Sequence, residues 1–417
     1  MQTSLSPEFK NTRSGTEAES ILRSCVHCGF CNATCPTYQV LGDELDGPRG
    51  RIYLIKQLLE GGEVGRSTQE HLDRCLTCLN CQTTCPSGVE YGRLIAIGRT
   101  LVDERVARPV LEKMTRWVLR EGMTSVLFAP LLKVGRALRP VLPMFLRKYV
   151  PSRPGTQTRT LPAREHARKV LMLAGCVQPG MMPNINSATA RVLDVCGIQT
   201  IEAEGAGCCG AIREHLSDPD GALANARRNI DAWWPLVGAG TVEAIVSNAS
   251  ACGLAVKNYS EALEHDPAYR DKAARVSALT RDLSELLPEL VPKLKVSLGS
   301  FAAERWVFHP PCTLQHGQGL RGGVETHLGE LGFDIRVAGH EAHLCCGSAG
   351  TYSVLQPELA RQLRDRKLEN LLDSRPSGIL SANIGCIQHL QSGTALPVRH
   401  WVEVLDEALR DSGYAPP

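Results

Sequence analysis

The sequence predicts an all-α module at the amino end, followed by two duplicated α/β domains. One cysteine string occurs twice before residue 90, with helix-like segments between its copies. A different cysteine pattern then recurs in the rest of the chain, among short apolar runs that alternate with helical segments, as in α/β folds with parallel strands. We expect residues 1–107 to form the first module, 108–160 a basic amphipathic helical connector and linker, and 161–298 and 299–417 the two α/β domains.

The first string has the spacing C-x-x-C-x-x-C-x-x-x-C-P. Its copies are Cys25, Cys28, Cys31 and Cys35, then Cys75, Cys78, Cys81 and Cys85, each copy followed by proline. Three cysteines at such gaps hold one [4Fe-4S] cluster, and the fourth ligates the neighbouring cluster. We therefore assign Cys25, Cys28, Cys31 and Cys85 to one cluster, and Cys75, Cys78, Cys81 and Cys35 to the other. The alternatives are a zinc ribbon and a disulfide framework, but zinc sites favour paired C-x-x-C ligands.

Helices are expected between the two copies of this string. The stretch 48–62 begins with a proline and ends with two glycines, which is typical of a helix, and a second helix is expected over residues 69–73. This pattern favours an all-α ferredoxin module with two clusters, and hence an electron carrier.

Composition excludes several classes of protein. The chain has 417 residues, 43% of them hydrophobic, and a formal charge of +2, so no overall basic character suggests nucleic-acid binding. Seventeen cysteines and a polar opening stretch without a basic-then-apolar leader indicate a reducing, cytoplasmic location. No apolar run is long enough for a membrane-spanning helix.

Positive charge is concentrated between residues 108 and 150. The bases there are Arg108, Lys113, Arg116, Arg120, Lys133, Arg136, Arg139, Arg147 and Lys148. Apolar residues lie between them, so we expect amphipathic helices broken at Pro130, Pro140 and Pro143. Such a segment suits peripheral contact with an anionic membrane surface or docking on a partner subunit, and the plainer alternative is packing on its own domain.

The second cysteine pattern is an internal repeat. Its copies are Cys176, Cys208, Cys209 and Cys252, then Cys312, Cys345, Cys346 and Cys386, at a nearly constant offset. Single cysteines follow the strand-like runs 170–174, 242–247, 306–308 and 378–381, and helices are expected over 219–234 and 357–372. Ligands of parallel sheets gather at the carboxyl ends of strands. Both sets are therefore candidate sites for zinc or a further cluster, with a redox dithiol or inert buried thiols as alternatives.

A resemblance to a known family extends over nearly the full length of the chain, and it is clearest in the stretches 25–61, 71–88, 309–318 and 343–353. They resemble the iron-sulfur subunits of bacterial glycolate oxidase, also called glycolate dehydrogenase, and more broadly proteins with paired CCG-type cysteine-rich domains. One departure concerns the last C-x-x-C of that superfamily, because Ala249 and Asn383 replace its earlier cysteine. This argues against a special cluster of the heterodisulfide-reductase kind.

The resemblance implies a function in electron transfer. Two flavoprotein-like partner subunits carrying FAD would oxidise glycolate, or D-lactate, and this chain would relay the electrons to a membrane quinone or another acceptor. Assembly at the cytoplasmic face of the inner membrane would follow. The alternatives are the iron-sulfur subunit of a D-lactate or anaerobic glycerol-3-phosphate dehydrogenase, a heterodisulfide-reductase-like protein, and a scaffold whose clusters only stabilise the fold.

Two weaker signals are set aside. Gly317, Gly319 and Gly322 fit a dinucleotide-binding pattern, but they do not directly follow a strand. For His309, His316, His340 and His343, which lie near the cysteines of the second repeat, we expect hydrogen-bonded structural roles, with ligation or proton handling near a quinone as the alternative.

Overall fold

The amino-terminal part of the chain consists of helices joined by loops. The computed structural model describes residues 1–125, 127–141, 162, 164–298 and 304–413. Before residue 125 its helices are α1 (Arg13–Ser24), α2 (Phe30–Ala33), α3 (Pro36–Leu41), the 3₁₀ turn η1 (Glu44–Asp46), α4 (Pro48–Leu59), α5 (Arg66–Asp73), α6 (Asn80–Thr84), α7 (Tyr91–Arg105) and α8 (Val110–Thr124). The two helices expected between the cysteine strings are α4 and α5.

Local sequence explains where these helices begin and what they bury. Proline opens both α3 and α4, where its missing N–H costs nothing and its fixed φ suits the first turn. Leu22, Ile55 and Leu94 come from α1, α4 and α7 and meet in one fully buried core. That core packs against both cysteine strings.

The connector continues with α9 (Phe128–Leu138) and the 3₁₀ turn η2 (Arg139–Val141). Pro130 lies in the first turn of α9 and does not break it, as expected of a residue whose N–H needs no helical partner. Pro140 lies in η2, and Pro143 lies outside the described residues. None of the described helices has the length and hydropathy needed to cross a bilayer.

The first α/β domain contains a parallel sheet in the order β2-β1-β3-β4. Its strands are β1 (Arg168–Met172), β2 (Ile198–Ile201), β3 (Ala244–Ser247) and β4 (Thr280–Asp282). Its helices are α11 (Gln178–Met181), α12 (Asn184–Val195), α13 (Ala211–His215), α14 (Pro219–Gly238), α15 (Ser250–Lys257), α16 (Tyr259–Ala262), α17 (Arg270–Leu279) and α18 (Leu283–Ser297). The expected helix over 219–234 is α14.

The second α/β domain repeats this topology, with the order β6-β5-β7-β8. Its strands are β5 (Arg305–His309), β6 (Asp334–Val337), β7 (Gly378–Ser381) and β8 (Val398–His400). The other elements are the π turn η3 (Thr313–Gly317) and the helices α19 (Gly323–Glu330), α20 (Tyr352–Leu355), α21 (Pro357–Leu372), α22 (Ile384–Gln391) and α23 (Trp401–Asp411). The expected helix over 357–372 is α21.

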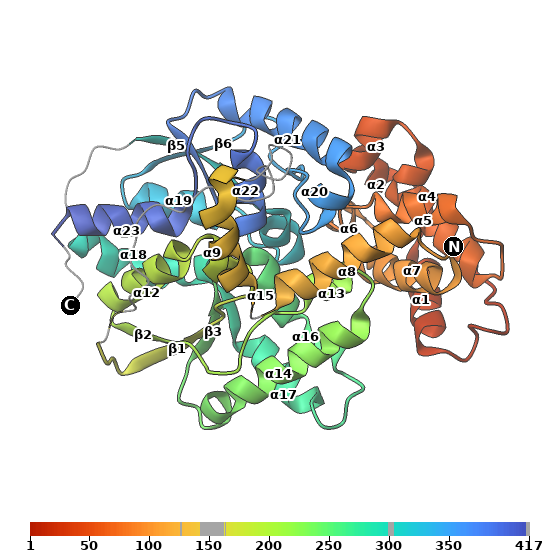
Figure 1. The fold of residues 1–417 in the computed structure, drawn as a ribbon, viewed down its shortest axis with the longest axis horizontal. Helices are drawn as coiled ribbons and strands as arrows, with labels where there is room; N and C mark the ends of the chain where they lie inside the picture. Colours follow the sequence, from red (N-terminus) through yellow and green to blue (C-terminus); the bar gives the residue numbers. More distant parts are fainter. Residues whose placement is uncertain (126, 142–161, 163, 299–303, 414–417) are drawn as a thin grey trace.

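The two α/β domains pack on each other and share a hydrophobic core. Side chains of α12 and α18 lie in the same buried cluster as side chains of β5, β7 and α23. Arg191 on α12 makes a buried two-bond ion pair with Asp406 on α23, with both N–O distances 2.7 Å. Figure 1 shows the helical module at one end of the molecule, with α8 and α9 crossing from it towards the α/β domains.

Candidate iron-sulfur and thiol sites

Two neighbouring hollows in the helical module collect the cysteines of the first string. One is lined by Cys25, Cys28, Cys31 and Cys85, and the other by Cys35, Cys75, Cys78 and Cys81. Each hollow thus receives three cysteines of one copy and the last cysteine of the other, which is the grouping expected from the spacing. Cys81 also lines the first hollow, so its side chain lies between the two.

The thiols within each hollow are close enough to oppose each other's ionisation. Burial, together with the nearby thiols of Cys25, Cys28 and Cys85, raises the pKa of Cys31 to about 11. Burial, followed by nearby thiols that include Cys78, likewise raises the pKa of Cys81. Four crowded thiolates need a bound cation to remain ionised, so each set fits a group made of iron and sulfide.

The backbone adopts the same unusual conformation in both copies of the string. Gly29 has φ +86°, and Leu79, at the matching position, has φ +62°. Glycine adopts this left-handed region at little cost, whereas leucine pays for it. A Cβ at Gly29 would also lie 2.6 Å from the Arg49 guanidinium. This guanidinium is the end of a flexible side chain and can move, so the positive φ is the main reason for glycine.

Polar groups surround the sulfurs of the second hollow. The Tyr91 hydroxyl donates to Cys75 Sγ at 3.6 Å, and the Thr37 hydroxyl lies 3.3 Å from Cys35 Sγ. The buried Arg51 guanidinium donates to Thr37 Oγ1 and to the His71 carbonyl, and its charge acts on Cys35 and Cys75. Hydrogen bonds and positive charge near ligand sulfurs raise a cluster's reduction potential.

The first α/β domain brings its four cysteines into a chain of thiol contacts. Hydrogen bonds link Cys176 to Cys208, Cys208 to Cys209, and Cys209 to Cys252. Bonds from Cys176 and Cys209 lower the pKa of Cys208 to about 3. Within the described residues, no three of these four sulfurs lie together closely enough to share one metal ion.

The second α/β domain builds a similar chain that reaches the helical module. Cys345 contacts Cys312 and Cys346, and Cys346 contacts Cys386. Cys312 also contacts Cys78, which lines the second hollow. Two further bonds hold this interface, between Thr83 Oγ1 and His316 Nδ1 and from the Tyr352 hydroxyl to the Arg74 carbonyl.

The histidines near these cysteines differ from one another. His316 has the expected structural role, because Nε2 lies 2.8 Å from the His343 carbonyl and Nδ1 lies 3.0 Å from Thr83 Oγ1. The same expectation is wrong for His309, whose two ring nitrogens are buried without a hydrogen-bond partner among the described residues. Lys367 is a further residue at this site that was not predicted, and its buried ammonium acts on Cys312, Cys345 and Cys346. Its position on α21 gives no signal in one sequence.

The glycines of the dinucleotide pattern do not lie in a strand-turn-helix arrangement. Gly317 ends the π turn η3, and Gly322 precedes α19, whereas β5 ends at His309. Setting this pattern aside therefore agrees with the structure.

Comparison with known proteins locates the same three units. Residues 21–89 match the 4Fe-4S dicluster domain, and residues 170–257 and 306–391 each match the cysteine-rich domain called CCG. The chain is 53% identical to the glycolate oxidase iron-sulfur subunit of Escherichia coli K12, over 98% of this chain and 99% of the relative. The chain belongs to the family of glycolate oxidase iron-sulfur subunits.

Other proteins are similar to this chain at lower identity. A probable glycolate oxidase iron-sulfur subunit of Bacillus subtilis 168 is 28% identical over 90% of this chain and 89% of its own length. Lactate utilization protein A of Exiguobacterium is 22% identical over 58% of this chain and 99% of its own length. The dicluster match makes this glycolate oxidase family member an iron-sulfur protein with two [4Fe-4S] clusters.

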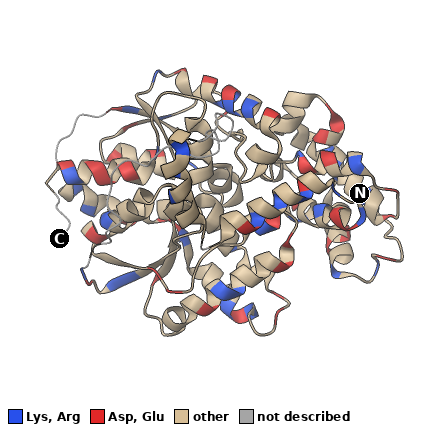
Figure 2. Ribbon diagram, viewed as in Figure 1, with Lys and Arg blue, Asp and Glu red and all other residues tan. Residues whose placement is uncertain are grey.

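Three arginines of the connector of this iron-sulfur subunit turn inward. Arg108 and Arg116 pair with Asp73, which lies two residues before Cys75, and Arg120 pairs with Asp218. Figure 2 shows acidic and basic segments interspersed along the connector and the neighbouring helices. Lys113 and Lys133 are exposed, together with the large apolar residues Val110, Leu111, Met114, Trp117, Val118, Leu127, Leu131, Val134, Leu138 and Val141. We call these ten apolar residues the connector face.

Proposed function

We propose that this chain is the electron-transfer subunit of a glycolate oxidase complex. Partner subunits carrying FAD oxidise glycolate, or D-lactate, to the oxo acid, and this chain passes the electrons to a quinone or another acceptor. The main support for the proposal is that the two sets of four cysteines line two adjacent hollows, with Cys81 lining both. Oxidation of a hydroxy acid releases two electrons, and a flavin is the cofactor that converts such a pair into single electrons.

The lining of the two hollows supports the proposed ligand sets. Cys25, Cys28, Cys31 and Cys85 hold one [4Fe-4S] cluster, and Cys35, Cys75, Cys78 and Cys81 hold the other. When bound, such clusters accept and release electrons singly. The protein's part is to keep them adjacent, to exclude water with the core around Leu22 and Ile55, and to place Tyr91 and Arg51 beside the second set.

The proposed organisation of the chain divides it at residues 107, 160 and 298. Residues 1–107 carry the two clusters, 108–160 connect, and 161–298 and 299–417 are the CCG domains. We also propose a cytoplasmic location, with the assembled complex at the inner face of the membrane.

A flavoprotein partner docks on the connector face in this proposal. Ten large apolar side chains are exposed there, eight of them at helical spacing on α8 and α9 and the other two, Leu127 and Val141, next to α9. Asp73, Glu112 and Asp218 neutralise several of the neighbouring bases, which weakens attraction to anionic lipid and favours a protein. The face is tied through Arg116 and Asp73 to the loop that carries Cys75, so docking there places the partner near the second hollow.

The ligand assignment is tested on the purified chain under anaerobic conditions. Cys28→Ser and Cys78→Ser should each lose one set of EPR signals after reduction, together with about half of the iron and sulfide. Cys196→Ser replaces a buried thiol outside both hollows and should keep both sets. Loss of neither signal in Cys28→Ser and Cys78→Ser would contradict the assignment.

The docking proposal is tested in the assembled complex. Trp117→Glu and Leu131→Glu should abolish co-purification of the flavoproteins while the iron content stays unchanged. Val296→Glu alters an exposed apolar residue on α18 and should leave the complex intact. Intact complexes of the two connector variants, combined with loss of their sedimentation with anionic vesicles, would show that the face binds lipid instead.

A further inference from the structure

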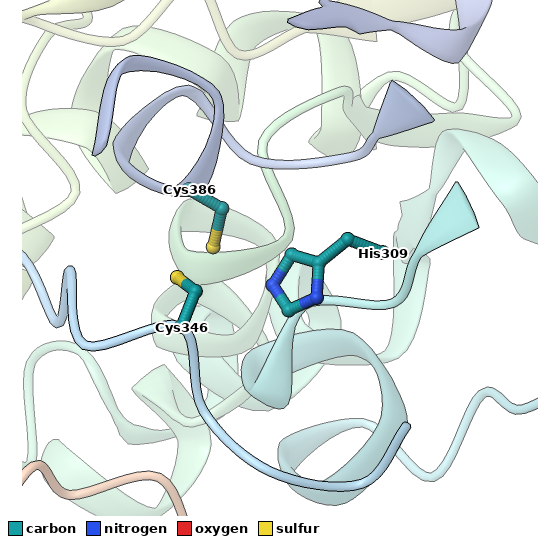
Figure 3. A group of neighbouring side chains, drawn as sticks. All are labelled: His309, Cys346 and Cys386. Carbon is teal, nitrogen blue, oxygen red and sulfur yellow. The ribbon is translucent and has the colours of Figure 1, made fainter. Parts of the chain in front are cut away.

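A histidine and two cysteines meet in the core of the second CCG domain. One ring nitrogen of His309 and the sulfurs of Cys346 and Cys386 all lie within 4.8 Å of one another. Figure 3 shows the two sulfurs pointing toward each other, with the imidazole ring beside them. All three side chains are buried, and those of His309 and Cys346 are 0% exposed.

Parallel strand pairing brings these residues together. His309 is the last residue of β5 and lies opposite Ser381, the last residue of β7, whose hydroxyl donates to the His309 carbonyl at 2.9 Å. Cys386 follows in the first turn of α22, and Cys346 comes from the loop before α20. The three groups therefore meet at the carboxyl ends of adjacent strands, where ligands of parallel sheets bind.

The imidazole of His309 has no hydrogen-bond partner among the described residues. Both ring nitrogens are fully buried and unpaired. Leaving a buried donor or acceptor unpaired costs about 1–3 kcal/mol, so nearly all such groups in native proteins have a partner. By contrast, the buried His400 donates or accepts at both nitrogens, toward the Asn248 carbonyl and the Val402 amide. A metal ion at the two sulfurs would give the His309 ring its missing partner.

A buried lysine and an amide lie beside these sulfurs. The Lys367 side chain is 2% exposed, and its ammonium donates to the carbonyls of Glu341 and Ala342. The charge of this ammonium acts on Cys312, Cys345 and Cys346. The Asn383 amide donates to Cys386 Sγ at 3.7 Å. A buried cation and an amide donor are the neighbours that metal-bound thiolates require.

The first CCG domain lacks these features. His309 lies three residues before Cys312, and Leu173 lies three residues before Cys176, the matching cysteine of the first domain. Gly210 lies close to the Ala222 carbonyl in the first domain, as Gly347 lies close to the Ala360 carbonyl in the second. If these two contacts are taken as equivalent, Asn229 occupies the position of Lys367. Asn229 instead bonds to the Gly207 amide and the Cys208 carbonyl. The histidine and the buried lysine thus occur in the second CCG domain and are replaced at the matching positions of the first, which can serve as an internal control.

We propose that the second CCG domain binds one divalent metal ion of the zinc class through His309 Nε2 or Nδ1, Cys346 Sγ and Cys386 Sγ. Two thiolates and one imidazole form a donor set that suits tetrahedral Zn²⁺, and three protein ligands leave its fourth position open. The two thiolates balance the charge of the ion. The proposal is independent of the substrate and partners proposed above.

Zinc content of the full-length protein tests the site. The wild-type chain is incubated anaerobically with Zn²⁺, freed of loosely bound ion by a chelator wash, and analysed for zinc, iron and sulfide. We expect one zinc per chain. His309→Leu, which copies the first domain, and Cys386→Ala should lose it, while Cys252→Ala, the counterpart of Cys386 in the first domain, should keep it.

Two further readouts separate ligation from folding. EPR signals of the two [4Fe-4S] clusters should persist in His309→Leu and show that the protein is assembled. His309→Cys should restore zinc binding, and X-ray absorption at the zinc edge should show loss of imidazole scattering and gain of a sulfur. Zinc-free wild type, equal zinc in His309→Leu, or iron and sulfide in excess of the two clusters would each overturn the proposal.

Discussion

The thiol of Cys312 contacts the thiol of Cys78, although the two residues belong to different domains. Cys312 follows β5 of the second CCG domain, and Cys78 lines the second hollow of the helical module. Leu76, Leu359 and Leu363 cover this contact in a small apolar cluster. The CCG domain therefore supplies part of the wall of a proposed cluster site.

We predict that Cys312→Ala lowers the reduction potential of the second cluster. A thiol that donates to a ligand sulfur stabilises the more negative, reduced state, and alanine removes this donor. Redox titration followed by EPR measures the change, and the first cluster should keep its potential. Cys196→Ala, which removes a buried thiol elsewhere, is the matched control. An unchanged potential in Cys312→Ala would show that the contact carries no electrostatic effect.

Tyr91→Phe should lower the same potential without changing the packing. The substitution removes only the hydroxyl that donates to Cys75 Sγ at 3.6 Å. Tyr91 is buried, so water cannot replace the lost donor. Redox titration of this variant should show a shift in the second cluster alone. Equal shifts in both clusters would instead point to a general loosening of the module.

Gly347→Ala, next to the Cys345 and Cys346 pair, should lower the thermal stability of the protein, and Gly350→Ala should lower it much less. Both glycines have positive φ, at +87° and +63°, so both variants pay about 1–2 kcal/mol of backbone strain. Only at Gly347 would the new Cβ also lie 2.5 Å from a backbone oxygen, that of Ala360. Thermal unfolding should therefore separate the variants by several degrees. Equal melting temperatures would contradict the close approach of this loop to α21.

Arg191→Met should destabilise the packing of the two CCG domains by about 3–5 kcal/mol, because it leaves the Asp406 carboxylate buried and without its main partner. Arg191→Met combined with Asp406→Leu should recover much of the loss. Denaturant unfolding of the single and double variants measures this coupling. If the single variant is as stable as the wild type, the ion pair makes no net contribution to the free energy of unfolding.

Local spacing predicted much of this structure, because the features concerned are local. The prolines at 48, 219 and 357 begin helices, and the apolar runs before Cys176, Cys312 and Cys386 include strands. The spacing also groups the first eight cysteines in the way they line the two hollows, and their assignment as cluster ligands stays a prediction. Each of these predictions depends on neighbours in sequence.

Tertiary relationships were not predictable in the same way. The contact between Cys312 and Cys78 spans most of the chain, and Lys367 acquires its role only when α21 packs over the cysteine loops. His309 was expected to be hydrogen-bonded, since most buried histidines are. The inward pairing of Arg108, Arg116 and Arg120 also reversed the orientation expected of a basic amphipathic helix. In each case a partner distant in sequence decides the outcome.

The most direct test is reduction of the proposed clusters by substrate in the complex assembled with its flavoprotein partners. Under anaerobic conditions glycolate should produce the EPR signals of both reduced clusters, and acceptor reduction should stop in the Cys28→Ser and Cys78→Ser complexes. Undiminished acceptor reduction in those two variants, with flavin and partner content unchanged, would contradict an electron path through this chain.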